Sequence, residues 1–120
     1  MLFKTDTAPV AVNFDMLLAA LPTPAYACSP DGRLIQYNEH AAQLWGRRPA
    51  LDDPAERFCG SHAMFSPDGT PLARDASWMA RALREDTPYG ENEVIIARPD
   101  GTQRTVLSYV TPVHDAQGAL

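Results

Sequence analysis

Residues 29–46, SPDGRLIQYNEHAAQLWG, constrain the fold most, because they specify a turn, a strand and a helix in immediate succession. Pro30 fixes φ near the value required at the second position of a β-turn. Gly32 supplies the positive φ that a three-residue hairpin loop needs. Residues 33–37 carry two aliphatic side chains and an aromatic one, which predicts a short strand.

A helix is predicted directly after this strand, over residues 39–45. Asn38 is the expected N-cap, because its side-chain oxygen can accept a hydrogen bond from a free amide of the first turn. Gly46 is placed to end the helix in the left-handed conformation. This local unit fixes architecture but contains no catalytic group.

Composition excludes several classes of protein. A net charge of −5 and scattered basic residues argue against a nucleic-acid surface, which requires clustered Lys and Arg. Two cysteines, Cys28 and Cys59, are too few for a disulfide scaffold and indicate free thiols. The sequence has neither an apolar run long enough to span a membrane nor a secretory signal, so we expect a cytoplasmic protein.

The N-terminal region predicts a flexible lead-in over residues 1–12, followed by an amphipathic helix that begins at Asn13. Its apolar stripe has helical spacing and consists of Phe14, Leu17, Leu18 and Leu21. This stripe either packs on its own domain or forms a dimer contact. The sequence leaves both alternatives open.

The rest of the chain predicts strands at both ends and helices between them. Strands are expected over residues 24–28, 93–98 and 103–113, in addition to 33–37. Residues 47–70 read as irregular, with a one-turn helix at Asp53-Pro54, and Asp75 is expected to cap a helix over residues 76–85. This order predicts an α+β domain with an antiparallel sheet.

Several short motifs follow one another in an order that is more specific than any single motif. They are the predicted strand 24–28, Asp31-Gly32-Arg33, Asn38 with Ala41-Ala42 and Leu44, Gly46, and Arg98-Pro99-Asp100-Gly101 with the strand after it. Together they resemble a PAS domain, which we expect over residues 13–120. In that family a five-stranded antiparallel sheet is faced on one side by short helices. The resemblance implies a sensory or interaction module of a bacterial signalling protein and not an enzyme.

The resemblance also implies a departure from the family at the C-terminal end. The fifth strand of a PAS domain lies in the centre of the sheet, and it would begin where Gly118-Ala119-Leu120 ends. We therefore expect this final central strand to be truncated, leaving four strands and a gap. A neighbouring chain or residues 1–12 would fill the gap, because unpaired strand edges are costly.

No set of residues predicts catalysis or a metal site. Cys59 and His62 offer two possible ligands, with no matching second pair. The helix 76–85 carries no histidine, so haem binding as in haem-binding PAS proteins is not supported. Arg57-Phe58-Cys59-Gly60 does not reproduce the cysteine motif of the flavin-binding relatives, so flavin is not supported either.

A mixed set of apolar and aromatic side chains either fills the core or surrounds a small pocket. Its members are Tyr26, Cys28, Trp45, Phe58, Met64, Phe65, Trp78, Met79 and Tyr109. Because the set is uncharged, any ligand is expected to be small, organic and neutral. The sequence does not identify that ligand.

The functional hypothesis is therefore a dimeric sensor that relays a signal to an output domain in the same chain. We expect that output to be a helix-turn-helix transcriptional regulator. A histidine kinase, a diguanylate cyclase or a ligand-free homodimerisation module are the alternatives. No direct contact with nucleic acid or membrane is expected.

Overall fold

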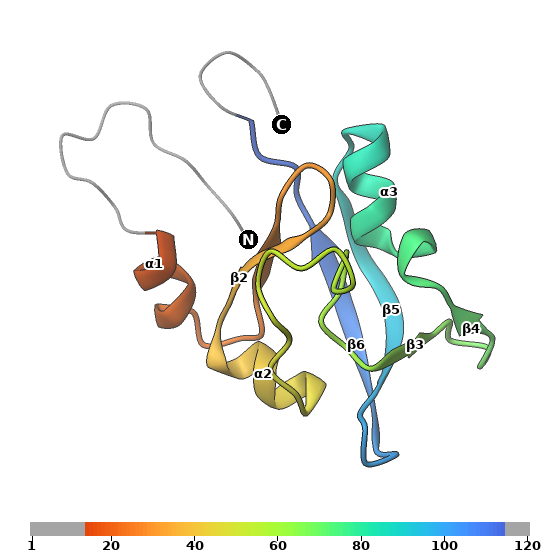
Figure 1. Ribbon diagram of the computed structural model, residues 1–120. Helices are drawn as coiled ribbons and strands as arrows, with labels where there is room; N and C mark the ends of the chain where they lie inside the picture. The colour runs from red at the N-terminus through yellow and green to blue at the C-terminus, as the bar shows by residue number, and fades with distance from the viewer. Residues whose placement is uncertain (1–13, 115–120) are drawn as a thin grey trace, which may run out of the picture.

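The structure is a computed structural model, and it describes residues 14–114. Its elements follow one another along the chain in this order (Figure 1): α1 (Phe14–Ala20), β1 (Tyr26–Cys28), β2 (Leu34–Tyr37), α2 (Glu39–Trp45), β3 (Ala63–Phe65), β4 (Pro71–Leu72), the 3-10 helix η1 (Arg74–Ala76), α3 (Trp78–Glu85), β5 (Tyr89–Ala97) and β6 (Gln103–Val110). All strand pairs are antiparallel. The predicted α+β fold is confirmed.

The strands form two separate sheets. β1 and β2 make a hairpin, and the second sheet has the order β4-β3-β5-β6. Within residues 14–114 no strand joins β1 to β6, so the edge of β6 that faces away from β5 has no strand partner there. The C-terminal end, after which the fifth strand was expected to begin, and the expected filling segment 1–12 lie outside the described residues.

The expectation of four strands was wrong, because the segment 47–70 is not wholly irregular. It contains β3, which pairs with β5, and the turn after β3 leads into β4. Each strand is only two or three residues long and is fixed by its partner rather than by a run of strand-forming residues. Asp53-Pro54 begins a turn and no helix.

The start of α3 also differs from the expectation. Ser77, and not Asp75, is the N-cap, because its hydroxyl accepts a hydrogen bond from the amide of Ala80 at 3.2 Å. Asp75 lies in η1, one turn earlier. The strand expected to start at residue 93 starts at Tyr89, directly after the helix.

The Pro-Asp-Gly triplet forms the same turn at three places. In each, the glycine amide donates to the carbonyl of the residue before proline, over 2.8 to 2.9 Å. The three glycines, Gly32, Gly69 and Gly101, have φ between 87 and 92°, a conformation that other residues adopt only at a cost. These turns join β1 to β2, β3 to β4 and β5 to β6.

Asn38 holds three segments together at the start of α2. Its Oδ1 accepts hydrogen bonds from the amides of Ala41 at 2.9 Å and Ala25 at 3.2 Å. Its Nδ2 donates to the carbonyls of Leu18 at 3.0 Å and Thr23 at 2.8 Å. The predicted cap therefore also ties α1 and the start of the first hairpin to α2. Gly46 ends the helix with φ of 69°.

The core lies between α2 and the larger sheet, where α2 and α3 both contact β5. Trp45 is 2% exposed and contacts the rings of Tyr26 and Tyr37 edge-on, each at a centroid distance of 5.3 Å. Gly60 packs against the Trp45 ring so closely that an added Cβ would lie 2.4 Å from it. A larger residue at position 60 would therefore displace the indole.

Candidate functional site

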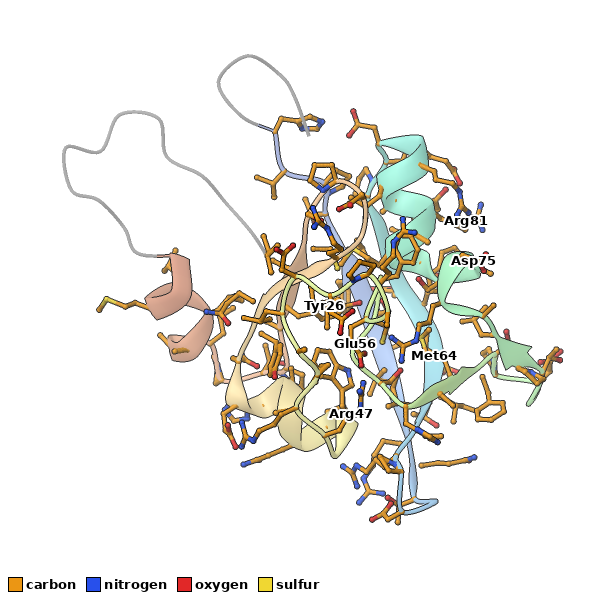
Figure 2. The ribbon with its side chains drawn as sticks, viewed as in Figure 1. Tyr26, Arg47, Glu56, Met64, Asp75 and Arg81 are labelled. Carbon is orange, nitrogen blue, oxygen red and sulfur yellow. The ribbon has the colours of Figure 1, made fainter. Side chains whose placement is uncertain are left out.

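The structure places four of the nine predicted pocket side chains in the packed core. These are Tyr26, Trp45, Met64 and Trp78, which pack in one hydrophobic cluster with residues of α2, β5 and β6. Such contacts stabilise the fold by burying apolar surface. Figure 2 shows Tyr26 and Met64 toward the centre of the molecule.

The other five predicted pocket residues do not form one group. Cys28, Phe65 and Met79 are half-buried on three different elements. Tyr109 is 63% exposed on β6 and faces solvent. Phe58 alone lines a groove, and that groove is elsewhere in the fold.

The groove lies between the β1–β2 turn, the loop before β3, and the helical segment η1–α3. It has a volume of about 330 Å³, near the lower end of the range for small-molecule sites. Its lining residues are Pro30, Asp31, Arg57, Phe58, Asp75, Ala80, Leu83 and Arg84. The charged residues form an exposed rim, while Phe58 and Leu83 are half-buried and Ala80 is buried. An apolar floor with a polar rim is the usual lining of a ligand site.

Phe58 has a strained backbone at the floor of this groove. Its φ is 70°, which is rare for a bulky residue and is often found at functional sites. Its amide donates to the carbonyl of Gly32 at 2.7 Å, and its carbonyl accepts from the Tyr26 hydroxyl at 2.8 Å. The ring lies against Gly32, where an added Cβ would be 2.2 Å from it. Hairpin and core together hold this conformation.

An ion network anchors the loop that carries Arg57 and Phe58. Glu56 accepts from Arg47 at 2.6 Å and from Arg74 at 3.2 Å, with 14% of its side chain exposed. The same two arginines donate to the carbonyls of Gly60 at 2.8 Å and Ser61 at 2.9 Å. The hydrogen bond from Arg47, with that from Arg74, holds the pKa of the Glu56 carboxyl below its usual range.

The helical wall of the groove is fixed to β5 by a stacked cluster. The rings of Trp78 and Tyr89 lie 5.2 Å apart, and the Arg81 guanidinium lies 5.0 Å from each ring centroid. Arg81 also pairs with Glu85 at 3.2 Å. Cation–π contacts of this kind restrain α3 against the sheet.

Buried thiol and hydroxyl groups lie behind the groove floor. Burial, with smaller contributions from Cys59 and Cys28, raises the pKa of Tyr26 well above its usual range. Burial also raises the pKa of Cys28 to about 12. Cys59 lies 3.1 Å from the Ser61 hydroxyl, and both residues are buried. High pKa values keep the phenol and the Cys28 thiol protonated, which makes that thiol a poor nucleophile.

The predicted dimer-contact stripe on α1 is divided. Leu18 is 2% exposed and belongs to the core of its own domain, whereas Leu17 and Leu21 are half-buried. The Phe14 side chain lies outside the described part. Met16, on the same helix, is a large apolar side chain that is 69% exposed.

Most groove residues were not predicted as site residues from the sequence. The groove takes residues from positions 30–31, 57–58 and 75–84, and no spacing in the sequence shows that these segments meet. The turn at Pro30 and the helix bearing Leu83 were predicted as structure only. The strained φ of Phe58 has no signal in the sequence.

Two further findings concern only residues 14–114. No cluster of three or more His, Cys, Asp or Glu side chains there is arranged to hold a metal ion. In that part of the chain, no helix has the length and apolarity needed to cross a membrane.

Comparison with known proteins identifies the family. No curated protein matches the chain significantly. A family model described as the PAS fold matches residues 18–120, which is most of the chain. The match agrees with the antiparallel sheets and short helices described above. The chain belongs to the PAS fold family, whose members are sensory and signalling modules.

Proposed function

We propose that this domain is the cytoplasmic sensor of a bacterial signal-transduction protein and that it binds a small organic molecule in the groove. Binding there shifts the packing of α3 against the sheet, and the change passes to an output domain in the same chain. A helix-turn-helix transcriptional regulator is the output we propose. The domain carries out no catalysis of its own in this proposal.

The single observation that carries this proposal is the groove itself, with its aromatic floor and charged rim. The earlier expectation of a neutral ligand depended on an uncharged set of side chains. Four of those side chains lie in the core, and the groove is lined in part by arginines. The lining of the groove therefore gives no reason to expect a neutral ligand.

A thermal-shift screen of metabolite-sized compounds tests the proposal. A ligand at 100 times its Kd stabilises a protein by about 2.7 kcal/mol. That corresponds to a rise in Tm on the order of 10 °C for a domain of this size. Hits should lose their effect on Leu83→Arg, which fills the groove, and keep it on Leu51→Arg, an exposed leucine outside the groove. No hits, or hits that stabilise Leu83→Arg equally, would count against the proposal.

Homodimerisation through β6 is a second candidate function. Leu107 and Tyr109 point to the same face of the strand and are 55% and 63% exposed. Exposed apolar residues on one face are typical of an interaction surface. Sedimentation velocity should show a dimer for the natural sequence and a monomer for Leu107→Asp, with Leu51→Asp as the matched control. A monomer at all concentrations for the natural sequence would remove this candidate.

A further inference from the structure

Two arginines that line the groove, Arg57 and Arg84, form no ion pair with any carboxylate among the described side chains. Arg57 donates to the carbonyl of Asp31 through Nε at 2.8 Å and through Nη2 at 2.5 Å, and Arg84 donates through Nη1 to the carbonyl of Asp75 at 2.7 Å. Neither arginine has an ion-pair partner within residues 14–114. The main-chain bonds therefore position both guanidinium groups while leaving their charges available to a ligand.

The two acids at the rim limit the charge that this ligand can carry. The Asp31 carboxylate is already paired with Arg33 at 3.0 Å and accepts a hydrogen bond from the Ser29 hydroxyl. The Asp75 carboxylate has no ion pair among the described residues, so it adds negative charge at the rim. Two positive charges beside this carboxylate favour a ligand with one negative charge over a dianion.

The floor of the groove favours an apolar ligand body. Phe58 and Leu83 are half-buried there and Ala80 is buried, in a volume of about 330 Å³. The Arg57 guanidinium lies 4.8 Å from the centroid of the Phe58 ring. This places a cation and an aromatic surface side by side, where one ligand can contact both.

We propose that the groove binds an organic monocarboxylate, whose apolar body packs on Phe58 and Leu83 and whose carboxylate is bound by Arg57 and Arg84. The inference rests on the proposed function, since it names the ligand class of the same groove. A carboxylate can accept from the guanidinium N–H groups of Arg57 and Arg84 that do not donate to the main chain, and a single ring with a short chain fits the available volume.

NMR titration of the ¹⁵N-labelled protein tests this with two probes of nearly equal shape, 3-phenylpropanoate and 3-phenylpropanamide. The acid should shift the amide resonances of Phe58 and Leu83 saturably and bind at least tenfold more tightly than the amide. Arg57→Gln and Arg84→Gln should each weaken acid binding about tenfold and leave amide binding unchanged. Arg104→Gln removes an arginine outside the groove that forms no ion pair with the described carboxylates, so it should change neither acid nor amide binding.

The outcomes separate this inference from the proposed function. Equal binding of acid and amide at the groove would overturn the monocarboxylate and leave the groove as a ligand site. Tighter binding of succinate or inorganic phosphate would overturn it in favour of a dianion. Absence of shifts with either phenyl probe would overturn it too, while the compound screen still tests the proposed function. If Arg57→Gln disturbs its loop, Arg84→Gln still measures the loss of acid binding, because Arg84 is an exposed position on α3.

Discussion

The hydroxyl of Tyr26 donates a hydrogen bond to the main-chain carbonyl of Phe58 over 2.8 Å, joining the core to the floor of the groove. Phe58 has a positive φ that is unfavourable for an aromatic residue. Tyr26 packs on Trp45 at the same time. A change in core packing is therefore connected physically to the surface where we propose that a ligand binds.

Tyr26→Phe should destabilise the domain and weaken binding at the groove. The substitution leaves the Phe58 carbonyl without its donor, at a cost of about 1 to 2 kcal/mol. Urea unfolding followed by tryptophan fluorescence measures the stability. Tyr37→Phe is the matched control, because Tyr37 also packs on Trp45 and donates to the Pro49 carbonyl at 2.8 Å. The control should lose similar stability and keep groove binding; equal loss of binding in both would contradict the connection.

Alkaline pH should destabilise the folded state through Cys28. The folded pKa is about 12, above the ordinary value of 9.0, so the folded state keeps a proton that the unfolded state loses. The contribution of the protonated Cys28 thiol to stability is therefore fully present below pH 9 and is lost as the pH rises from 9 to about 12. Between pH 9 and 12, the free energy of unfolding of Cys28→Ala should fall less steeply than that of the natural sequence, by up to about 1.4 kcal/mol per pH unit. If the free energy of unfolding falls with pH equally steeply in the natural sequence and in Cys28→Ala between pH 9 and 10, the role of Cys28 is refuted.

Acid should release the loop before β3 through Glu56. Its folded pKa is lowered by the hydrogen bonds from Arg47 and Arg74, so the stabilisation is present above the unfolded pKa, ordinarily 4.5. It is lost as pH falls through the lower folded value. Glu56→Gln should lower the free energy of unfolding by about 2 kcal/mol at pH 7. It should also reduce the loss of that free energy as the pH falls into the acid range. Glu39 forms an exposed ion pair with Arg48, so Glu39→Gln should change neither the free energy of unfolding at pH 7 nor its dependence on acid pH.

Asn38→Ala should be the most damaging of these substitutions. It removes the helix cap and leaves buried main-chain groups of Ala25 and Leu18 without partners, at a cost of about 3 kcal/mol. Asn38→Asp keeps the accepting oxygen but places a second carboxylate oxygen against the carbonyls of Leu18 and Thr23, so its melting temperature should also fall well below that of the natural sequence. A melting temperature unchanged by Asn38→Ala would remove this residue from its structural role.

Local sequence was sufficient where the chain folds on itself. The turn at Pro30, the cap at Asn38 and the glycine at Gly46 act within a few residues, and each is present as predicted. In the segment 47–70, which was expected to be irregular apart from one helical turn, the structure has a turn at Pro67 with β3 before it and β4 after it. Those strands are too short to show a pattern, and pairing with β5 is what makes β3 extended.

The groove could not be predicted for a related reason. It needs the β1–β2 turn, the loop at Phe58 and the last turns of α3 to meet, and only long-range packing brings them together. The nine apolar candidates had the composition of a pocket lining. Composition does not distinguish a pocket lining from a packed core, and Trp45 and Met64 belong to the core.

The most direct test of the central claim is a crystal structure of the domain with the strongest hit of the thermal-shift screen. If the groove is the ligand site, ligand density should lie in it, in contact with Phe58 and Leu83, with Trp45 still packed edge-on against Tyr26. Density among Trp45, Met64 and Ile96, with the groove empty, would contradict it.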